Sequence, residues 1–115
     1  MKLPKSVEEY ITTRIQRYST EASKYEGGVG IPVGTAGIEF RWKEAILYAL
    51  KAAVKLDGVA LKDVKDELVK YGKFLVRVHN ARRPKDINWS RWEESNDHFI
   101  ESTMREIAEL VSKST

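Results

Sequence analysis

Apolar side chains recur through the middle of this chain at alternating steps of three and four residues. The series consists of Leu61, Val64, Leu68, Tyr71, Leu75 and Val78. Such a series forms one continuous face of an α-helix and is typical of the seam along which a helix packs on a neighbour. We therefore predict one helix that begins near Leu61, runs through Gly72, which lies off this seam, and ends before Pro84. A short strand over residues 74–78 is the alternative, because FLVRV is β-prone and a glycine weakens a helix.

Two further helices are predicted ahead of this segment. Ser6 and Glu9 form a capping box, and apolar residues then recur at helical spacing, which predicts a helix from about Val7 to Glu26. Residues 27–37 (GGVGIPVGTAG) hold five of the seven glycines and are predicted to form a loop. Good helix formers run from Ile38 to Leu56, with apolar side chains round most of the circumference, which indicates a helix central in a bundle.

The last predicted helix runs from about Arg91 to Ser112, after a second capping box formed by Ser90 and Glu93. Its outer face is acidic and carries Glu93, Glu94, Asp97, Glu101, Glu106 and Glu109. A chain of 115 residues is long enough to bury one core without metal or disulfide support. The predicted fold class is therefore all-α: a single helical domain over residues 1–115, a four-helix bundle with a long glycine-rich loop between helices one and two.

The composition argues against several kinds of site. The chain has no cysteine, which excludes a disulfide framework, a thiolate metal site and a cysteine nucleophile. His79 and His98 are the only histidines and fall on different predicted helices, so we expect no metal site and no cofactor. No apolar run approaches the roughly 18 residues of a membrane span, so we expect a soluble cytoplasmic protein without a membrane partner.

The basic residues are concentrated in one stretch, although the net charge is only +3. Between Lys70 and Lys85 the chain carries six Lys and Arg residues and His79, but no carboxylate. Such a run attracts a polyanion by counterion release, so nucleic acid, single-stranded or duplex, is the expected partner. The expected phosphate-binding residues are Lys70, Lys73, Arg77, Arg82, Arg83 and Lys85, extended by Arg41, Lys51 and Lys55 of the second helix. The alternative is an ordinary solvated face whose cations pair with the acidic last helix.

Aromatic residues accompany the basic run, and aromatic planes bind unpaired bases by stacking. The residues concerned are Tyr71, Phe74, Trp89 and Trp92. Tyr71 and Trp92 have the helical spacing of core positions. Trp89 precedes the predicted helix cap, so it is the expected exposed platform for a base.

Arg91 and His98 form the one pair suited to catalysis. They lie two turns apart on one face of the last predicted helix, where the histidine would act as general acid or base and the arginine would stabilise a developing charge. The spacing resembles the Arg-x(4 to 6)-His signature of the HEPN ribonuclease family, small helical domains that cleave RNA without a metal ion. This resemblance implies a metal-independent RNase as an alternative function, whereas ordinary local pairing of both side chains implies no enzyme.

The size, the helicity and the charge layout together resemble those of the small subunit of CRISPR effector complexes. The residues that carry this likeness are Lys70, Lys73, Arg77, Arg82 and Arg83, with Arg41, Lys51 and Lys55. The resemblance implies a non-catalytic subunit of a larger ribonucleoprotein in antiviral defence, which binds the nucleic-acid backbone without reading sequence. A protein–protein adaptor bundle, with protein partners or self-association, is the third hypothesis.

Overall fold

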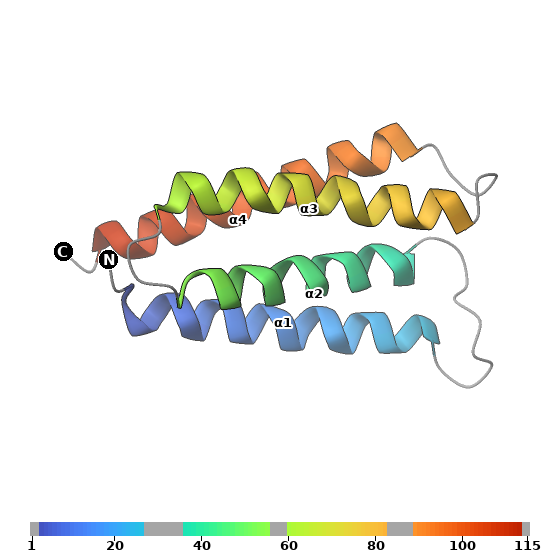
Figure 1. Cartoon of the computed structure of the whole chain (residues 1–115). Helices are drawn as coiled ribbons and strands as arrows, with labels where there is room; N and C mark the ends of the chain where they lie inside the picture. The colour runs from blue at the N-terminus through green and yellow to red at the C-terminus, as the bar shows by residue number, and fades with distance from the viewer. Residues whose placement is uncertain (1–2, 27–35, 56–59, 83–88, 114–115) are drawn as a thin grey trace.

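The computed structural model of the chain describes residues 3–26, 36–55, 60–82 and 89–113, and all of its regular structure in these ranges is α-helical (Figure 1). The helices are α1 (Lys5–Glu26), α2 (Ala36–Ala53), α3 (Leu61–Arg82) and α4 (Trp89–Lys113). The four predicted helices are thereby confirmed. The prediction of one helix through Gly72 is also confirmed, and the alternative of a short strand over residues 74–78 is wrong, because α3 is continuous through this segment.

The helix starts differ from the predicted ones. α1 begins at Lys5 and α4 begins at Trp89, so Ser6 and Ser90 lie inside the first turn and do not cap it. The backbone N–H of Val7 donates to the carbonyl of Pro4 at 3.0 Å, and the Ser6 hydroxyl is buried with no hydrogen-bond partner. Both predicted capping boxes are therefore wrong. At the start of α1 the hydrogen-bond acceptor is therefore the backbone carbonyl of Pro4 and not a serine side chain.

The second helix is also shifted toward the N-terminus. α2 begins two residues before the predicted Ile38 and ends at Ala53, three residues before Leu56. Of the predicted glycine-rich loop, residues 27–35 lie outside the described part of the chain, and Ala36 and Gly37 belong to α2.

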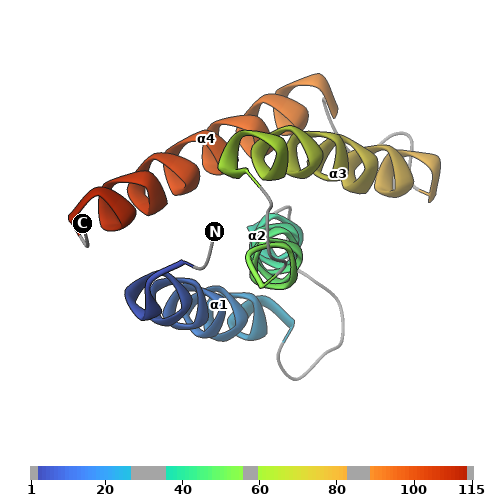
Figure 2. The same ribbon diagram turned by 60° about the vertical axis from the view of Figure 1, so that its left-hand side comes forward.

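The helices form two antiparallel hairpins that pack into a bundle (Figures 1 and 2). α1 pairs with α2, and α3 pairs with α4. α2 joins the hairpins, because it contacts α3 and α4 as well as α1. In the described ranges α1 and α3 make no contact, so they form one diagonal of the bundle. The prediction that the second helix is central is thus confirmed, and α4 has the same number of neighbours.

All four helices contribute to the main apolar core. Its buried members are Val7, Ile11, Ile15, Ile46, Leu47, Leu50, Val64, Leu68, Phe99, Ile100, Met104 and Ile107. A second, smaller cluster of Trp42, Val76 and Trp92 joins α2, α3 and α4. The indole rings of Trp42 and Trp92 meet edge to face with centroids 4.7 Å apart. Burial of this much apolar area is what holds the two hairpins together.

Gly72 lies where α3 and α4 approach each other closely. The apolar series from Leu61 to Val78 predicts that this glycine lies off the packing face of α3, and this prediction is wrong. A Cβ at this position would lie 3.3 Å from both Asn96 Cβ and Ile100 Cδ1, which is tighter than ordinary packing. The buried amide of Asn96 donates a hydrogen bond of 3.1 Å to the Gly72 carbonyl. The glycine therefore permits a hydrogen bond from the Asn96 side chain of α4 to the backbone of α3, at a place where a larger residue would push the two helices apart.

Candidate nucleic-acid interface

Three of the predicted phosphate-binding residues lie together on α3. Lys70, Lys73 and Arg77 are spaced three and four residues apart, and we call them the α3 basic face. The side chains of Lys70 and Arg77 are 75% and 69% exposed. The grouping of these three cations on one helix agrees with the sequence prediction.

Carboxylates nevertheless oppose this face, contrary to what the local sequence indicates. Lys70 Nζ lies 3.3 Å from Glu67 Oε1, one turn earlier on α3. Arg77 Nε lies 3.6 Å from Oε1 of Glu93, which reaches across from α4. For Arg77 the alternative of pairing with the acidic last helix therefore holds. The Lys70–Glu67 pair is exposed on both sides, and such pairs contribute only about 0–1 kcal/mol. Glu93 is only 18% exposed, and its Oε1 is buried without a hydrogen-bond partner in the described structure.

Asp97 on α4 is the third carboxylate near this face. Burial raises the pKa of the Asp97 carboxyl, the charge of Lys73 lowers it, and the charges of Glu93 and Glu94 raise it again. One of its oxygens, Oδ1, is buried with no hydrogen-bond partner in the described structure. Lys73 is therefore opposed by the partly buried carboxylate of Asp97 on α4.

The cations of α2 have neighbours on α2 itself and near α1. Arg41 Nη1 bonds to the carboxylate of Glu44 at 3.1 and 3.3 Å. Lys51 and Lys55 line a cavity of about 360 Å³ between the N-terminal segment and the end of α2, together with Leu3, Pro4, Val7, Glu8 and Val54. The extension of the α3 basic face by Arg41, Lys51 and Lys55 stays a prediction.

Several predicted site residues fall where the structure describes no side chain. Arg83 and Lys85 lie outside the described residues. Arg82 and Trp89 lie in helices, at the end of α3 and the start of α4, but their side chains are outside the described part. Their roles in binding stay predictions.

The exposed aromatic residue next to the basic run is Phe74. Its side chain is 57% exposed, and its ring stacks on that of half-buried Tyr71 with an interplanar angle of 19°. Trp92 is buried in the small cluster, as predicted. Phe74 is among the aromatic residues noted beside the basic run, but Trp89 is the one that the sequence predicts to be the exposed platform. Phe74 is absent from the apolar series of α3, and this is the sequence signal that it is exposed.

The two histidines have different surroundings. The ring of His79 lies against the rings of Trp42 and Trp92, with centroids 5.8 and 5.6 Å apart, and its Nε2 is buried without a hydrogen-bond partner among the described residues. His98 and Arg91 are both exposed on α4. The described residues contain no group of three or more metal-ligating side chains. A catalytic role for Arg91 and His98 stays a prediction.

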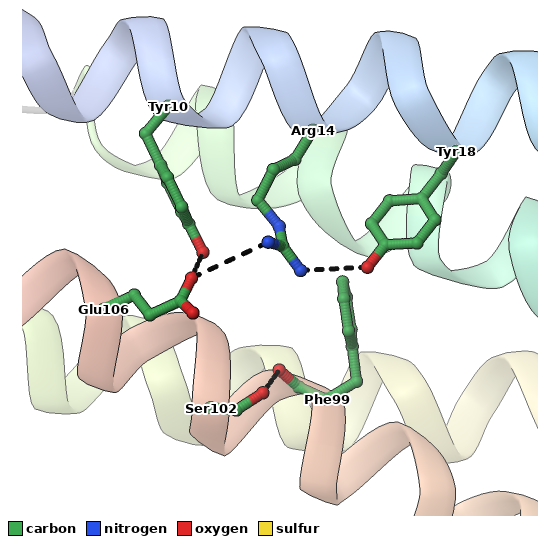
Figure 3. Close-up of polar contacts among 6 residues, drawn as sticks. All are labelled: Tyr10, Arg14, Tyr18, Phe99, Ser102 and Glu106. Atoms are coloured by element: carbon green, nitrogen blue, oxygen red, sulfur yellow. Dashed lines mark hydrogen bonds and ion pairs between the residues drawn. The ribbon is translucent and has the colours of Figure 1, made fainter.

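A polar cluster between α1 and α4 was not anticipated from the sequence. Figure 3 shows the hydroxyl of Tyr10 bonded to the carboxylate of Glu106, and Arg14 between Glu106 and Tyr18. Arg14 Nη1 lies 3.7 Å from Glu106, and Nη2 donates to the Tyr18 hydroxyl at 2.9 Å. Tyr18 also meets Phe99 of α4 edge to face. This cluster fastens α1 to α4, since the two helices share few other contacts.

Comparison with protein-family models, with curated proteins and with solved structures finds no match to this chain. None of the helices in the described ranges is long and apolar enough to cross a membrane. The functional argument therefore rests on the residues of the α3 basic face and their surroundings.

Proposed function

We propose that this protein is a non-catalytic nucleic-acid-binding protein that contacts the phosphate backbone through the α3 basic face. The observation that carries the proposal is the exposure of Lys70 and Arg77, which lie two turns apart on one side of α3. Cations held on a rigid helix bind successive phosphates and release counterions, which is the main source of affinity in backbone recognition. Arg82, Arg83 and Lys85 follow directly in the sequence and would lengthen this contact.

The ion pairs of the face do not argue against this function. Lys70 and Glu67 are both exposed, so a phosphate can replace this carboxylate at little cost. Arg77 meets the mostly buried Glu93 through Nε at 3.6 Å, but its side chain is 69% exposed, so it can bind a phosphate while this ion pair stays in place. Lysine and arginine contacts to phosphate fix the position of a strand but carry no sequence information. We therefore propose binding without sequence readout.

The same features support a place within a larger assembly. A small helical bundle with one cationic side and an acidic α4 suits a cytoplasmic subunit that holds nucleic acid on one side and a protein neighbour on the other. This layout is the basis of the resemblance to small CRISPR subunits, and membership of such a ribonucleoprotein is part of the proposal.

The proposal is tested by removing charge from the face. Lys70→Gln combined with Arg77→Gln should weaken binding of a single-stranded oligonucleotide by about ten- to twentyfold at physiological salt, since each phosphate contact contributes about fourfold through counterion release. The matched control is Lys5→Gln with Lys62→Gln, which removes two exposed lysines from the first turns of α1 and α3. Filter binding measures both variants. Equal losses in the two variants, or no loss in either, would refute the proposal.

A second assay separates binding from catalysis. Purified protein should leave a mixed RNA pool intact over hours, because the proposed site contains no general acid or base. If the RNA is cleaved, and if His98→Ala abolishes the cleavage, the chain is an RNase that uses Arg91 and His98, and the non-catalytic proposal is wrong.

A further inference from the structure

Phe74 is exposed without the packing that normally explains an aromatic side chain. Among the described residues, Tyr48 and Phe74 are the large hydrophobic side chains that remain mainly exposed, at 55% and 57%. Phe74 is not among the α3 residues that enter the cores, which are Val64, Leu68 and Val76. The core therefore does not account for this residue.

The neighbours of Phe74 are cations. Lys70 precedes it by one turn and Arg77 follows it by three residues, so all three lie on the same side of α3. With a rise of 1.5 Å per residue, the ring sits about 6 Å along the axis from Lys70 and about 4.5 Å from Arg77. A ligand that covers the ring must also meet both positive charges. An apolar protein surface would have to desolvate these charges, whereas a polyanion with flat apolar groups fits all three side chains.

The ring is also held in place. Tyr71 lies one turn earlier, and its ring is nearly parallel to that of Phe74, with centroids 6.4 Å apart. Tyr71 itself packs against the main core and is half-buried. Phe74 is thus a supported, outward-facing plane, which loses little conformational freedom when a second plane stacks on it.

We infer that Phe74 is a stacking platform for an unpaired base, so that the polyanion bound by the α3 basic face is a single strand. This inference rests on the proposed function and narrows its ligand class. Bases within a duplex are already stacked on one another and present only their edges in the grooves, so Phe74 adds nothing to duplex binding. The platform is indifferent to base identity, because every base has a π-face.

The test compares single strands with a duplex of the same length. Binding of the wild-type chain to a fluorescent DNA strand, an RNA strand of the same sequence and the DNA duplex is measured by anisotropy. Phe74→Ala should weaken both single-strand affinities by at least about fivefold, the lower end of the effect of losing one stacked base, and leave the duplex affinity unchanged. Phe74→Tyr should retain wild-type affinity. Tyr48→Ala, which removes an equally exposed ring from α2, is the matched control and should change nothing.

The outcomes distinguish this inference from the proposed function. If Phe74→Ala has no effect, or weakens duplex and single strands equally, while Lys70→Gln with Arg77→Gln still weakens binding, the platform is refuted and backbone binding stands. If neither single strands nor duplex bind in a salt-dependent way, both ideas fail. Self-association of the wild type that Phe74→Ala abolishes, without nucleic-acid binding, would identify the ring as a protein contact and would also overturn the inference.

Discussion

At the scale of single residues, the contact between Gly72 and Asn96 strongly limits the size of the side chain at position 72. The Gly72 position leaves little room for a side chain, because Asn96 Cβ and Ile100 Cδ1 lie 3.3 Å from where a Cβ would be, so these neighbours would have to shift. We expect Gly72→Val to lower the free energy of unfolding by about 1–3 kcal/mol through overpacking. Chemical denaturation followed by circular dichroism measures the change.

The control for this variant places the same side chain at an exposed site of α3. Glu67→Val introduces valine with the same helix propensity but no packing conflict, and should cost less than about 0.5 kcal/mol. A Gly72→Val protein as stable as wild type would show that α3 and α4 do not approach as closely as described.

Asp97 gives a second prediction at this scale. Burial raises the pKa of its carboxyl, so the folded state favours the protonated form. The stabilisation from this group is complete below the ordinary pKa of 3.8 and is lost as the pH rises through the raised pKa. Asp97→Asn should therefore raise the thermal midpoint at pH 7, and its advantage should disappear below pH 3.8.

The matched control removes an exposed carboxylate from the same helix. Glu109→Gln makes the same change in net charge, so a gain that both variants share would reflect overall charge and not the buried site. An Asp97→Asn protein that is less stable than wild type at pH 7 would contradict the argument. Because Asp97 opposes Lys73, the same variant should also bind nucleic acid more tightly.

At the scale of helices, the contact between α1 and α4 depends on Tyr10. Burial, and then the hydrogen bond to Glu106, raise the pKa of its hydroxyl, while Arg14 lowers it. The neutral form is favoured in the folded state, so its stabilisation is complete below the ordinary pKa of 10.0 and is lost as the pH rises through the raised value. Wild type should therefore lose thermal stability more steeply than Tyr10→Phe as the pH rises from about 10 to about 11.

Tyr48→Phe provides the comparison for this prediction, because Tyr48 is exposed and distant from Glu106 in the sequence and on another helix. Its thermal midpoint should follow that of wild type over the same pH range. If Tyr10→Phe also follows wild type, the hydroxyl of Tyr10 does not fasten α1 to α4.

The number and the approximate extent of the helices follow from apolar periodicity. The residues at which each helix begins and ends, and the face that it turns toward its neighbours, do not. α1 and α4 begin at Lys5 and Trp89, one residue ahead of Ser6 and Ser90, and at the start of α1 the Val7 N–H donates to the backbone carbonyl of Pro4. The apolar series contains Val78, but it is Val76 that is fully buried near the end of α3. The close approach at Gly72 turns the face of α3 that carries Val76 toward α4. Local sequence cannot report a contact that depends on the neighbouring helix.

For the candidate site, the sequence predicts which cations share a helix face but not which carboxylates lie opposite them. Lys70, Lys73 and Arg77 share a face because helical spacing alone places them there. The carboxylates of Glu93 and Asp97 come from α4, so the charge balance of the face depends on how the two helices pack. The position of Lys51 toward α1 likewise depends on the packing of α2, which a single helix pattern does not specify.

At the scale of the whole molecule, the cluster of Trp42, Val76 and Trp92 joins the two hairpins at one end. The hairpins share the main core as well, so the bundle should unfold in one cooperative step. Trp42→Ala should cost about 3–5 kcal/mol, the usual effect of removing a large buried aromatic side chain. Tryptophan fluorescence and far-ultraviolet circular dichroism should report the same midpoint in the wild type. Two separate transitions would show that the hairpins fold independently.

The salt dependence of oligonucleotide binding tests the central claim most directly. If Lys70, Lys73 and Arg77 bind phosphates, the logarithm of the association constant for a single strand should fall linearly with the logarithm of salt concentration, with a slope of about −2 or steeper. Lys70→Gln with Arg77→Gln should reduce the magnitude of this slope by about 1.4, and Lys5→Gln with Lys62→Gln should leave it unchanged. A slope near zero in the wild type, or the same slope in the α3 variant, would contradict the account.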